Sequence, residues 1–247
     1  MEFSITNVNN YLQHGAVRLG KRLRNFKLKF TSCDLCDGPC QQYSLLCQHC
    51  HMDLPLFSYQ QIQGNLLNWP AINKGLPGHE FERLICVAPY LWPFDQWLTQ
   101  LKYQGRFELS GLCAELMAEC WHSLQSTVPR PDAILSVPIH GKRWQERGFN
   151  QSHLIAQKLA KAISTPYQAS RLIRHKDTSR QVGQTGSQRR KNLRQAFGIN
   201  NHKELPEHIL LIDDVVTTGT TANEICKLLK QKGVKTVTLM AVCLTLP

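Results

Sequence analysis

A short stretch near the C-terminus constrains the fold more than any other part of the chain. Residues 209–221 read ILLIDDVVTTGTT: four apolar residues run into two adjacent acids, Asp213 and Asp214, and two valines then lead into threonines around Gly219. A short continuous apolar run is typical of a strand buried on both faces of a sheet. Neighbouring carboxylates repel each other, so a cation or hydroxyl donors must compensate them. The stretch therefore predicts a buried strand that ends in a polar ligand site.

The residues after the two acids suit a phosphate. A helix predicted over residues 221–232 would present free N–H groups and a partial positive charge at its N-terminus. Gly219 allows close backbone approach, and the threonine hydroxyls add uncharged donors. Asp213 and Asp214 can accept the two vicinal hydroxyls of a ribose, and we expect both side chains at an exposed edge. The plainer alternative is a strand-to-helix turn with capping acids. No Walker lysine is present, which argues against nucleoside triphosphate hydrolysis.

Strands and helices alternate over the C-terminal two thirds of the chain. Strands are predicted at residues 83–90, 133–137, 208–212 and 234–242, and helices at about 94–105, 109–124, 150–163 and 221–232. This order predicts a doubly wound α/β fold, a mainly parallel sheet with helices on both faces. We assign it to residues 83–247, with residues 59–82, rich in Gln, Asn, Gly and Pro, as a linker from an N-terminal segment, residues 1–58.

Five of the ten cysteines crowd into eighteen residues near the N-terminus. Two C-x-x-C pairs are formed by Cys33 and Cys36 and by Cys47 and Cys50. Four thiolates in tetrahedral array suit Zn²⁺, and a closed shell of four makes the site structural. Spare donors lie close by: Cys40, His49 and His51. Free buried thiols are the alternative, although some fifty mostly polar residues could hardly fold unaided.

Charge is distributed unevenly along the chain, whose formal net charge is +11. Residues 171–194 carry eight Lys and Arg against one acid, and residues 1–32 carry six against one. This pattern favours polyanionic partners such as phosphates or nucleic acid, and a solvated basic surface is the alternative. The apolar runs fall far short of the ~20 residues of a membrane helix. The first fifteen residues lack the apolar core of a signal peptide, so we expect a cytoplasmic protein without membrane insertion.

A second loop is predicted at the same edge of the sheet, because it also leaves the carboxyl end of a strand. Residues 136–152 read SVPIHGKRWQERGFNQS and place Lys142, Arg143 and Arg147 on this loop. Together with the start of the following helix, these cations form a plausible pyrophosphate site. His140 could act as an acid or base, although a lone loop histidine is more often incidental.

The basic segment at residues 171–197 has few apolar residues and no clear periodicity. A polar insertion this long between strands is usually functional or disordered. As a flap over a polyanionic substrate, its arginines, Arg189 among them, could neutralise a departing pyrophosphate and exclude water.

Residues 209–221 resemble the phosphoribosyl pyrophosphate (PRPP) signature of type I phosphoribosyltransferases, in which a hydrophobic run leads to two acids, two apolar residues and a Thr/Gly-rich loop. The resemblance implies that Asp213 and Asp214 hold the ribose hydroxyls and that residues 217–221 cradle the 5-phosphate. Some purine enzymes of this fold carry a third acid where this chain has Thr217, which leaves the acceptor open. The PRPP-binding set is then Asp213, Asp214, Val215, Val216, Thr217, Thr218, Gly219, Thr220, Thr221, Lys142 and Arg143.

Over residues ~31–244 the chain resembles the ComF family, the amidophosphoribosyltransferase-like, GntX-like proteins of bacterial competence. The pattern comprises the C-x-x-C pairs, V-P-x-x-x-x-R-x-x-x-R-G-F-N-Q, T-x-x-Q with R-x-x-N-x-x-x-A-F, and D-D-V-x-T-T-G-x-T. Further matching positions are Tyr90, Lys102, Pro138, Arg143, Arg147, Gly148, Phe149, Asn150, Gln151, Thr178, Gln181, Arg189, Asn192, Ala196 and Phe197. The resemblance implies a role in handling transforming DNA, and it favours the two cysteine pairs over Cys40 as zinc ligands.

Two functions follow as hypotheses. In the first, a PRPP-binding protein acts on or with single-stranded DNA during uptake. If it is an enzyme, a nitrogen nucleophile attacks Mg²⁺-bound PRPP, and Arg147 and Arg189 stabilise the leaving pyrophosphate. In the second, a non-catalytic adaptor senses PRPP, while the zinc module and basic segments bind DNA or a helicase-like partner.

Overall fold

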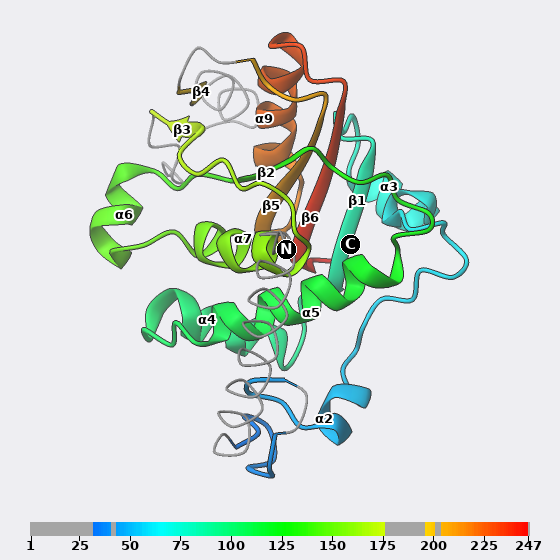
Figure 1. The fold of residues 1–247 in the computed structure, drawn as a ribbon, viewed down its shortest axis with the longest axis vertical. Coiled ribbons are helices and arrows are strands. Elements are labelled where there is room, and N and C mark those ends of the chain that lie inside the picture. Colours follow the sequence, from blue (N-terminus) through cyan, green and yellow to red (C-terminus); the bar gives the residue numbers. More distant parts are fainter. Residues whose placement is uncertain (1–31, 41–42, 176–195, 201–203, 247) are drawn as a thin grey trace, which may run out of the picture. The chain divides into compact units, whose positions relative to one another are not determined.

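The structure is a computed structural model that describes residues 32–40, 43–175, 196–200 and 204–246 (Figure 1). The chain divides into two compact units, Met1–Leu54 and Pro55–Pro247. The basic residues of the N-terminal run lie outside the described residues, as does Arg189. Among the described helices, none has the length and hydropathy to cross a membrane.

A four-stranded sheet forms the centre of the second unit. Its strands are β1 (Arg83–Pro89), β2 (Ala133–Ser136), β5 (His208–Val216) and β6 (Thr236–Leu244), in the order β1-β6-β5-β2. All three pairs are parallel, which confirms the expected fold class. Strand β5 continues four residues beyond the predicted end, because its ladder with β6 extends from His208 to Val216. Both acids therefore lie inside the strand and not in the loop after it.

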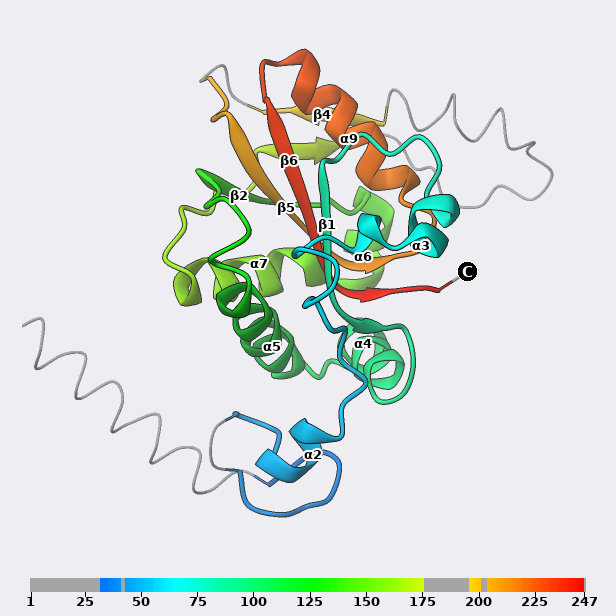
Figure 2. The ribbon, with the colours of Figure 1, turned by 90° about the vertical axis from the view of Figure 1, so that its right-hand side faces the viewer.

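Helices cover both faces of the sheet (Figure 2). Helices α4 (Phe94–Tyr103), α5 (Leu109–Ser123) and α7 (Gln151–Ala162) belong to one side, where α5 packs on α7 and both contact strands. Helix α9 (Thr220–Gln231) belongs to the other. Successive strand residues point to opposite faces. Ile209 and Leu211 accordingly share one core cluster with Ile225 and Leu229 of α9.

Residues 59–82 fold as part of the second unit in place of the expected linker. They contain a 3₁₀ turn, η1 (Leu66–Asn68), and helix α3 (Pro70–Gly75). Six of their apolar side chains are buried in the same core cluster as α9: Ile62, Leu66, Leu67, Ile72, Leu76 and Phe81. The Tyr59 hydroxyl donates to the Cys86 carbonyl (2.7 Å). The segment looks like a linker because most of its residues are polar, but its apolar side chains pack on one face of the sheet.

The second loop contains a helix that the sequence did not indicate. Helix α6 (Gly141–Arg147) begins after His140, whose Nδ1 accepts from the Lys142 N–H (3.2 Å), and none of its residues is buried. Gly148 ends the helix with a φ of 75°, in the left-handed region that favours glycine. The three expected cations of this segment therefore lie on a short surface helix. His140 serves as its N-cap.

The described ends of the basic segment pair with each other. Strand β3 (Leu172–Arg174) runs antiparallel to β4 (Phe197–Ile199), with Arg174 opposite Phe197. Most of the flap predicted at residues 171–197, namely residues 176–195, lies outside the described part of the chain.

Candidate functional site

A cavity of about 450 Å³ opens at the carboxyl ends of the parallel strands. Parallel strands bring their carboxyl ends to one edge, so the segments after β1, β2, β5 and β6 can meet there. Each of them contributes to the lining: Tyr90, Val137, Pro138, Ile139, Thr217 and Thr245. Both acids of β5 also line this cavity. The predicted edge site is thus a real concave surface formed by segments far apart in sequence.

Asp213 and Asp214 are held by side chains of α7 and α4. The Ser152 hydroxyl donates to Asp213 Oδ1 (3.1 Å), and the Gln151 amide donates to Asp214 Oδ1 (3.3 Å). Lys102 of α4 forms an ion pair with Asp214 Oδ2. Only 8% of the Asp214 side chain and 17% of the Lys102 side chain is exposed. The expectation of an exposed edge is therefore wrong for Asp214, because the helices that cover this face enclose it.

The two carboxyl groups are electrostatically different. Burial and the neighbouring Asp214 raise the pKa of Asp213 well above its ordinary value. Burial also raises the pKa of Asp214, but Lys102 outweighs this effect and the pKa of Asp214 is lowered. Conversely, Asp214 outweighs burial at Lys102 and raises the pKa of the ammonium. Asp213 therefore holds a proton more strongly than an ordinary carboxyl does, whereas Asp214 is stabilised as the carboxylate that pairs with the Lys102 ammonium.

The threonine loop forms a smaller pocket of about 60 Å³ beside Asp213, lined by residues 215–222. Gly219 is the N-cap of α9 and has a φ of 66°, a conformation that other residues adopt at a cost. The Thr218 and Thr220 hydroxyls lie 2.8 Å apart. Val216, Thr218, Gly219 and Thr220 line the small pocket, whereas Val215, Thr217 and Thr221 line both cavities. The loop offers N–H groups and hydroxyls to an anion at the start of a twelve-residue helix.

The basic wall of the larger cavity comes from α6. Arg143 and Arg147 line it, whereas the exposed Lys142 does not. The Arg147 guanidinium donates to the Tyr103 hydroxyl (2.8 Å) and lies 4.8 Å from the centroid of that ring. It also donates to the Gln151 Oε1 (3.3 Å). Because Gln151 in turn donates to Asp214, the arginine and the acid are connected through one amide.

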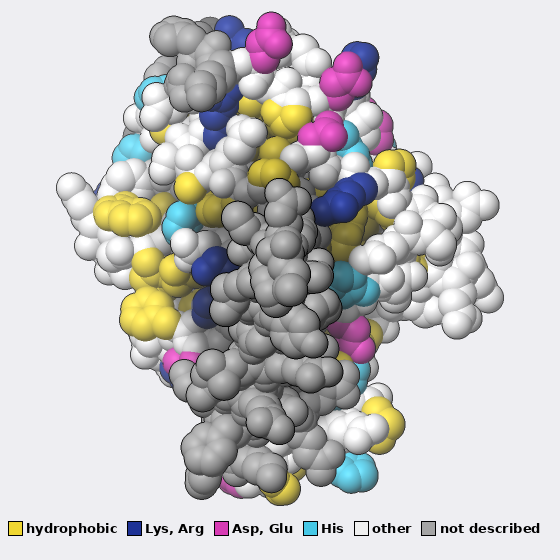
Figure 3. Space-filling model, viewed as in Figure 1, with side chains coloured by type: hydrophobic (Ala, Val, Ile, Leu, Met, Phe, Trp, Pro, Cys, Tyr) yellow, Lys and Arg dark blue, Asp and Glu magenta, His cyan; other side chains and the backbone are white. Residues whose placement is uncertain are grey.

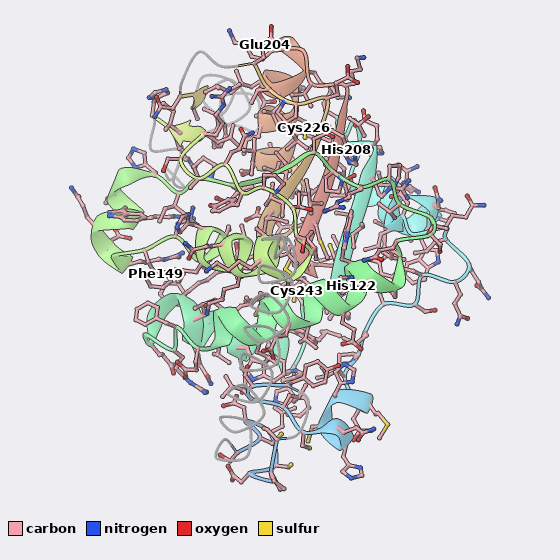
Figure 4. The ribbon with its side chains drawn as sticks, in the orientation of Figure 1. His122, Phe149, Glu204, His208, Cys226 and Cys243 are labelled. Carbon is pink, nitrogen blue, oxygen red and sulfur yellow. The ribbon has the colours of Figure 1, made fainter. Side chains whose placement is uncertain are left out.

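An aromatic pair lies beside α6, outside the cavity lining. Phe149, which follows α6, lies between α6 and α4 (Figure 4). Its ring meets Phe107 edge to face, with centroids 4.8 Å apart. Phe107 is 50% exposed, and Tyr103, which lines the cavity and contacts Arg147, is 69% exposed.

Several side chains of the site had no assigned role in the sequence-based prediction. Lys102, Gln151 and Ser152 hold the acids, and Arg174 of β3 contributes a further cation to the lining. One signal could have identified Lys102, since it follows the buried Leu98 by four residues and so lies on the apolar stripe of α4. A charge at such a position needs a buried partner.

The four paired cysteines of the first unit converge. The Sγ atoms of Cys33, Cys36, Cys47 and Cys50 all lie within 4.8 Å of one another, and those of Cys36 and Cys47 are 3.6 Å apart. Cys47 is also the N-cap of α2 (Gln48–Met52). Four sulfur ligands at this separation could hold a metal such as zinc, as the spacing predicted.

The spare donors point elsewhere. His51 stacks on Tyr43 with ring centroids 4.5 Å apart, and its Nε2 lies 3.0 Å from the Tyr43 hydroxyl. Cys40 is buried but does not belong to the four-sulfur group. Within the group, burial raises the pKa of Cys33, but backbone N–H groups outweigh it and lower the pKa to about 7. One thiolate is thus favoured, and a cation would be needed to stabilise all four.

Comparisons with known proteins agree with this arrangement. The family profile "Phosphoribosyl transferase domain" matches residues 150–245. The DNA utilization protein YhgH of Escherichia coli O157:H7 is 34% identical over 219 residues, which cover 87% of this chain and 90% of that protein. Competence protein F of Haemophilus influenzae is 32% identical over 209 residues, 82% of this chain and 87% of that protein.

Among solved structures, one that aligns with part of this chain is a glutamine PRPP amidotransferase from B. subtilis complexed with ADP and GMP. It is 18% identical, with a TM-score of 0.40, and the alignment covers 58% of this chain and 30% of that one.

Proposed function

Since the chain belongs to the ComF family of phosphoribosyltransferase-like proteins, we propose that it binds Mg²⁺-PRPP at the carboxyl edge of its sheet and uses it in handling single-stranded DNA. The observation that carries the PRPP proposal is one cavity that combines two acids, a threonine loop and two arginines. The acids suit the ribose hydroxyls of PRPP, the threonine loop suits its 5-phosphate, and the arginines suit its pyrophosphate. Relatives named for DNA utilization and competence support the role in DNA handling.

The ribose would be held by Asp213 and Asp214. Both are acceptors when ionised, and vicinal hydroxyls are donors. Because the pKa of Asp213 is raised, its proton leaves at a higher pH than that of an ordinary carboxyl, and it must leave before both groups can accept. Lys102 fixes the position of Asp214 and supplies a positive charge to the same site.

The phosphates would be held at opposite sides of the ribose. The 5-phosphate fits the loop at residues 217–221, where the dipole of α9 favours an anion. The pyrophosphate fits Arg143 and Arg147 on the α6 wall, with the exposed Lys142 of the same helix as a further cation outside the cavity lining. Mg²⁺, when bound with PRPP, neutralises part of the pyrophosphate charge.

As an enzyme, the protein would transfer the phosphoribosyl group to a nitrogen nucleophile. The nitrogen forms a bond to the anomeric carbon, the bond from that carbon to the pyrophosphate oxygen breaks, and its electron pair leaves with pyrophosphate. Arg147 and Arg189 would stabilise the charge that develops on the leaving group. A non-catalytic PRPP-sensing adaptor is the second candidate, in which the zinc module and the basic segments would bind DNA or a helicase-like partner.

The PRPP site is tested by ligand-induced stabilisation. With Mg²⁺ present, PRPP is expected to raise the melting temperature of the wild-type protein, and Asp213→Asn to abolish the rise because it removes one of the two carboxylates. Binding should release a proton, so affinity should increase with pH up to the raised pKa of Asp213. Isothermal titration calorimetry in two buffers of different ionisation enthalpy measures this proton.

Glu146→Gln is the matched control, since Glu146 is an exposed acid of α6 outside the cavity lining. It should leave both the thermal response and the proton release unchanged. A wild-type response to PRPP in Asp213→Asn would exclude the ribose assignment.

Pyrophosphate release separates the enzyme from the adaptor. Cations that act on the leaving group matter more in the transition state than in the bound substrate. Arg147→Ala and Arg189→Ala are therefore expected to lower turnover more than PRPP affinity, each by about 2–4 kcal/mol of barrier, the scale of one lost electrostatic donor. The assay follows pyrophosphate with purines, pyrimidines, other amines and single-stranded DNA as acceptors. PRPP binding without turnover for any acceptor would establish the adaptor.

A further inference from the structure

Helix α6 separates two cavities with different linings. On one side Arg143 and Arg147, one helical turn apart, face the PRPP-type cavity. On the other side Gly141 and Trp144 line a second cavity of about 460 Å³. Because no residue of α6 is buried in the core, nothing in the fold requires an aromatic ring at position 144.

The second cavity has an aromatic and apolar wall. Trp144 is 51% exposed and lines the cavity together with Leu172 and Ile173 of β3. Hydrophobic side chains gather over α6 and the end of α4 on the molecular surface, with Lys and Arg beside them (Figure 3). A flat aromatic face next to branched apolar side chains is suited to a planar ring.

The polar part of this cavity is a fixed chain of three side chains. The Ser136 hydroxyl lies 2.8 Å from the Tyr167 hydroxyl, which lies 2.7 Å from Nδ1 of His153. Ser136 and His153 line the cavity. With Nδ1 committed to Tyr167, the other ring nitrogen of His153 has no hydrogen-bond partner within the described part of the chain. The His153 imidazole, oriented by its hydrogen bond with Tyr167, and the Ser136 hydroxyl can therefore form hydrogen bonds with the edge of a planar ring.

Positive charge lies beside the same cavity. Arg174 lines this cavity as well as the PRPP-type cavity, and Lys142 and Arg143 are exposed on α6 immediately before Trp144. Aromatic faces interleaved with Lys and Arg are the usual means of binding unpaired nucleotides, through base stacking and phosphate contacts.

We propose that this second cavity, the Trp144 pocket, binds an unpaired nucleobase stacked on Trp144, with its edge on Ser136 and His153. The base belongs either to a free nucleoside or to a single DNA strand, whose phosphates would lie at Lys142 and Arg143. The strand source rests on the proposed function in DNA handling, whereas base binding itself does not depend on PRPP.

The test compares ligands that differ only in the base. The probes are the four deoxynucleosides, a short fluorescent thymidine oligonucleotide and an abasic oligonucleotide of the same length and charge. We expect the wild-type protein to bind the thymidine strand about tenfold more tightly than the abasic strand, the scale of one base stack. Trp144→Ala should remove this difference, and Trp144→Phe should keep most of it. Fluorescence anisotropy measures the strands, and equilibrium dialysis measures the nucleosides.

The salt dependence of binding separates stacking from electrostatic attraction, and a matched variant tests whether any exposed tryptophan has the same effect. Trp144→Ala should weaken binding by the same factor at every salt concentration, because stacking releases no counterions. Trp92→Ala, which removes a comparably exposed tryptophan (59%) before α4, should bind like the wild type. The melting temperature of each variant, with and without PRPP, verifies the fold and the PRPP site separately.

Each outcome decides the matter. Nucleoside binding that Trp144→Ala abolishes supports the pocket with a free base as ligand. Discrimination confined to the strands supports it with DNA as ligand. Equal affinity for thymidine and abasic strands together with no nucleoside binding, or an unchanged affinity in Trp144→Ala, overturns the pocket. Failure of PRPP to stabilise the wild-type protein would overturn the PRPP site and leave the result on the Trp144 pocket intact.

Discussion

Replacing Cys47 by serine is expected to unfold the N-terminal unit while the parallel sheet remains folded. Cys47 contributes a sulfur to the four-cysteine group and caps α2, and few of the described apolar side chains of this unit are buried. A metal held by the four cysteines would therefore take the place of a hydrophobic core. Structural zinc contributes roughly 10–16 kcal/mol in small peptides, so the loss of one ligand exceeds what the unit can tolerate.

Metal analysis and limited proteolysis measure this effect. The wild-type protein should contain one zinc per chain and resist cleavage over residues 32–54, whereas Cys47→Ser should lose the metal and be cut there. Cys40→Ser is the matched control, because Cys40 is buried in the same unit but lies outside the sulfur group. Freshly purified wild-type protein without zinc would exclude the structural site.

The elements predicted correctly from the sequence are those whose structure is determined by a few neighbouring residues. The apolar run from Ile209 to Ile212 could only be a strand buried on both faces, and it occupies an interior position of the sheet, between β6 and β2. The cysteine spacing similarly placed four sulfur atoms together, since each C-x-x-C pair directs two thiols to one point. In both cases a few neighbouring residues determine the geometry.

The features that sequence reasoning missed depend on distant contacts. Residues 59–82 look like a linker because their composition is polar, yet Leu66 and Phe81 are buried against strands formed later in the chain. Helix α6 has no buried stripe, so periodicity could not reveal it. The role of Lys102 appears only when α4 and β5, more than a hundred residues apart, meet over Asp214.

Removing the cation of the Lys102–Asp214 ion pair is expected to have the second large effect, on the stability of the fold. Lys102→Met is expected to destabilise the protein by roughly 3–5 kcal/mol near neutral pH, because it leaves the buried Asp214 carboxylate without its cation. The neighbouring groups are Asp213, Gln151 and Ser152, and none of them carries a positive charge that could replace the Lys102 ammonium. The free energy of unfolding from denaturant titrations measures the loss.

Lys158→Met is the matched control. Lys158 of α7 is partly buried but donates to the Ser110 hydroxyl (2.7 Å) and not to a carboxylate. Its replacement should cost only about 1 kcal/mol, the scale of one hydrogen bond, and the cost should not diminish in acid. The double variant Lys102→Met with Asp214→Asn should be more stable than Lys102→Met alone, because the uncompensated charge is gone.

The pH dependence of the Lys102→Met effect identifies the ion pair as its cause. In the wild-type protein the pKa of Asp214 is lowered, so the pair stabilises the fold above the unfolded-state pKa of about 3.9. This contribution is lost as the pH falls through the lowered folded-state value. In Lys102→Met, burial would instead raise the pKa of Asp214, so the carboxyl takes up a proton at a higher pH. The difference in stability between the two proteins should therefore shrink steadily from neutral pH towards pH 4. A difference that stays constant over this range would mean that Lys102 stabilises the fold through packing of its aliphatic chain and not through charge.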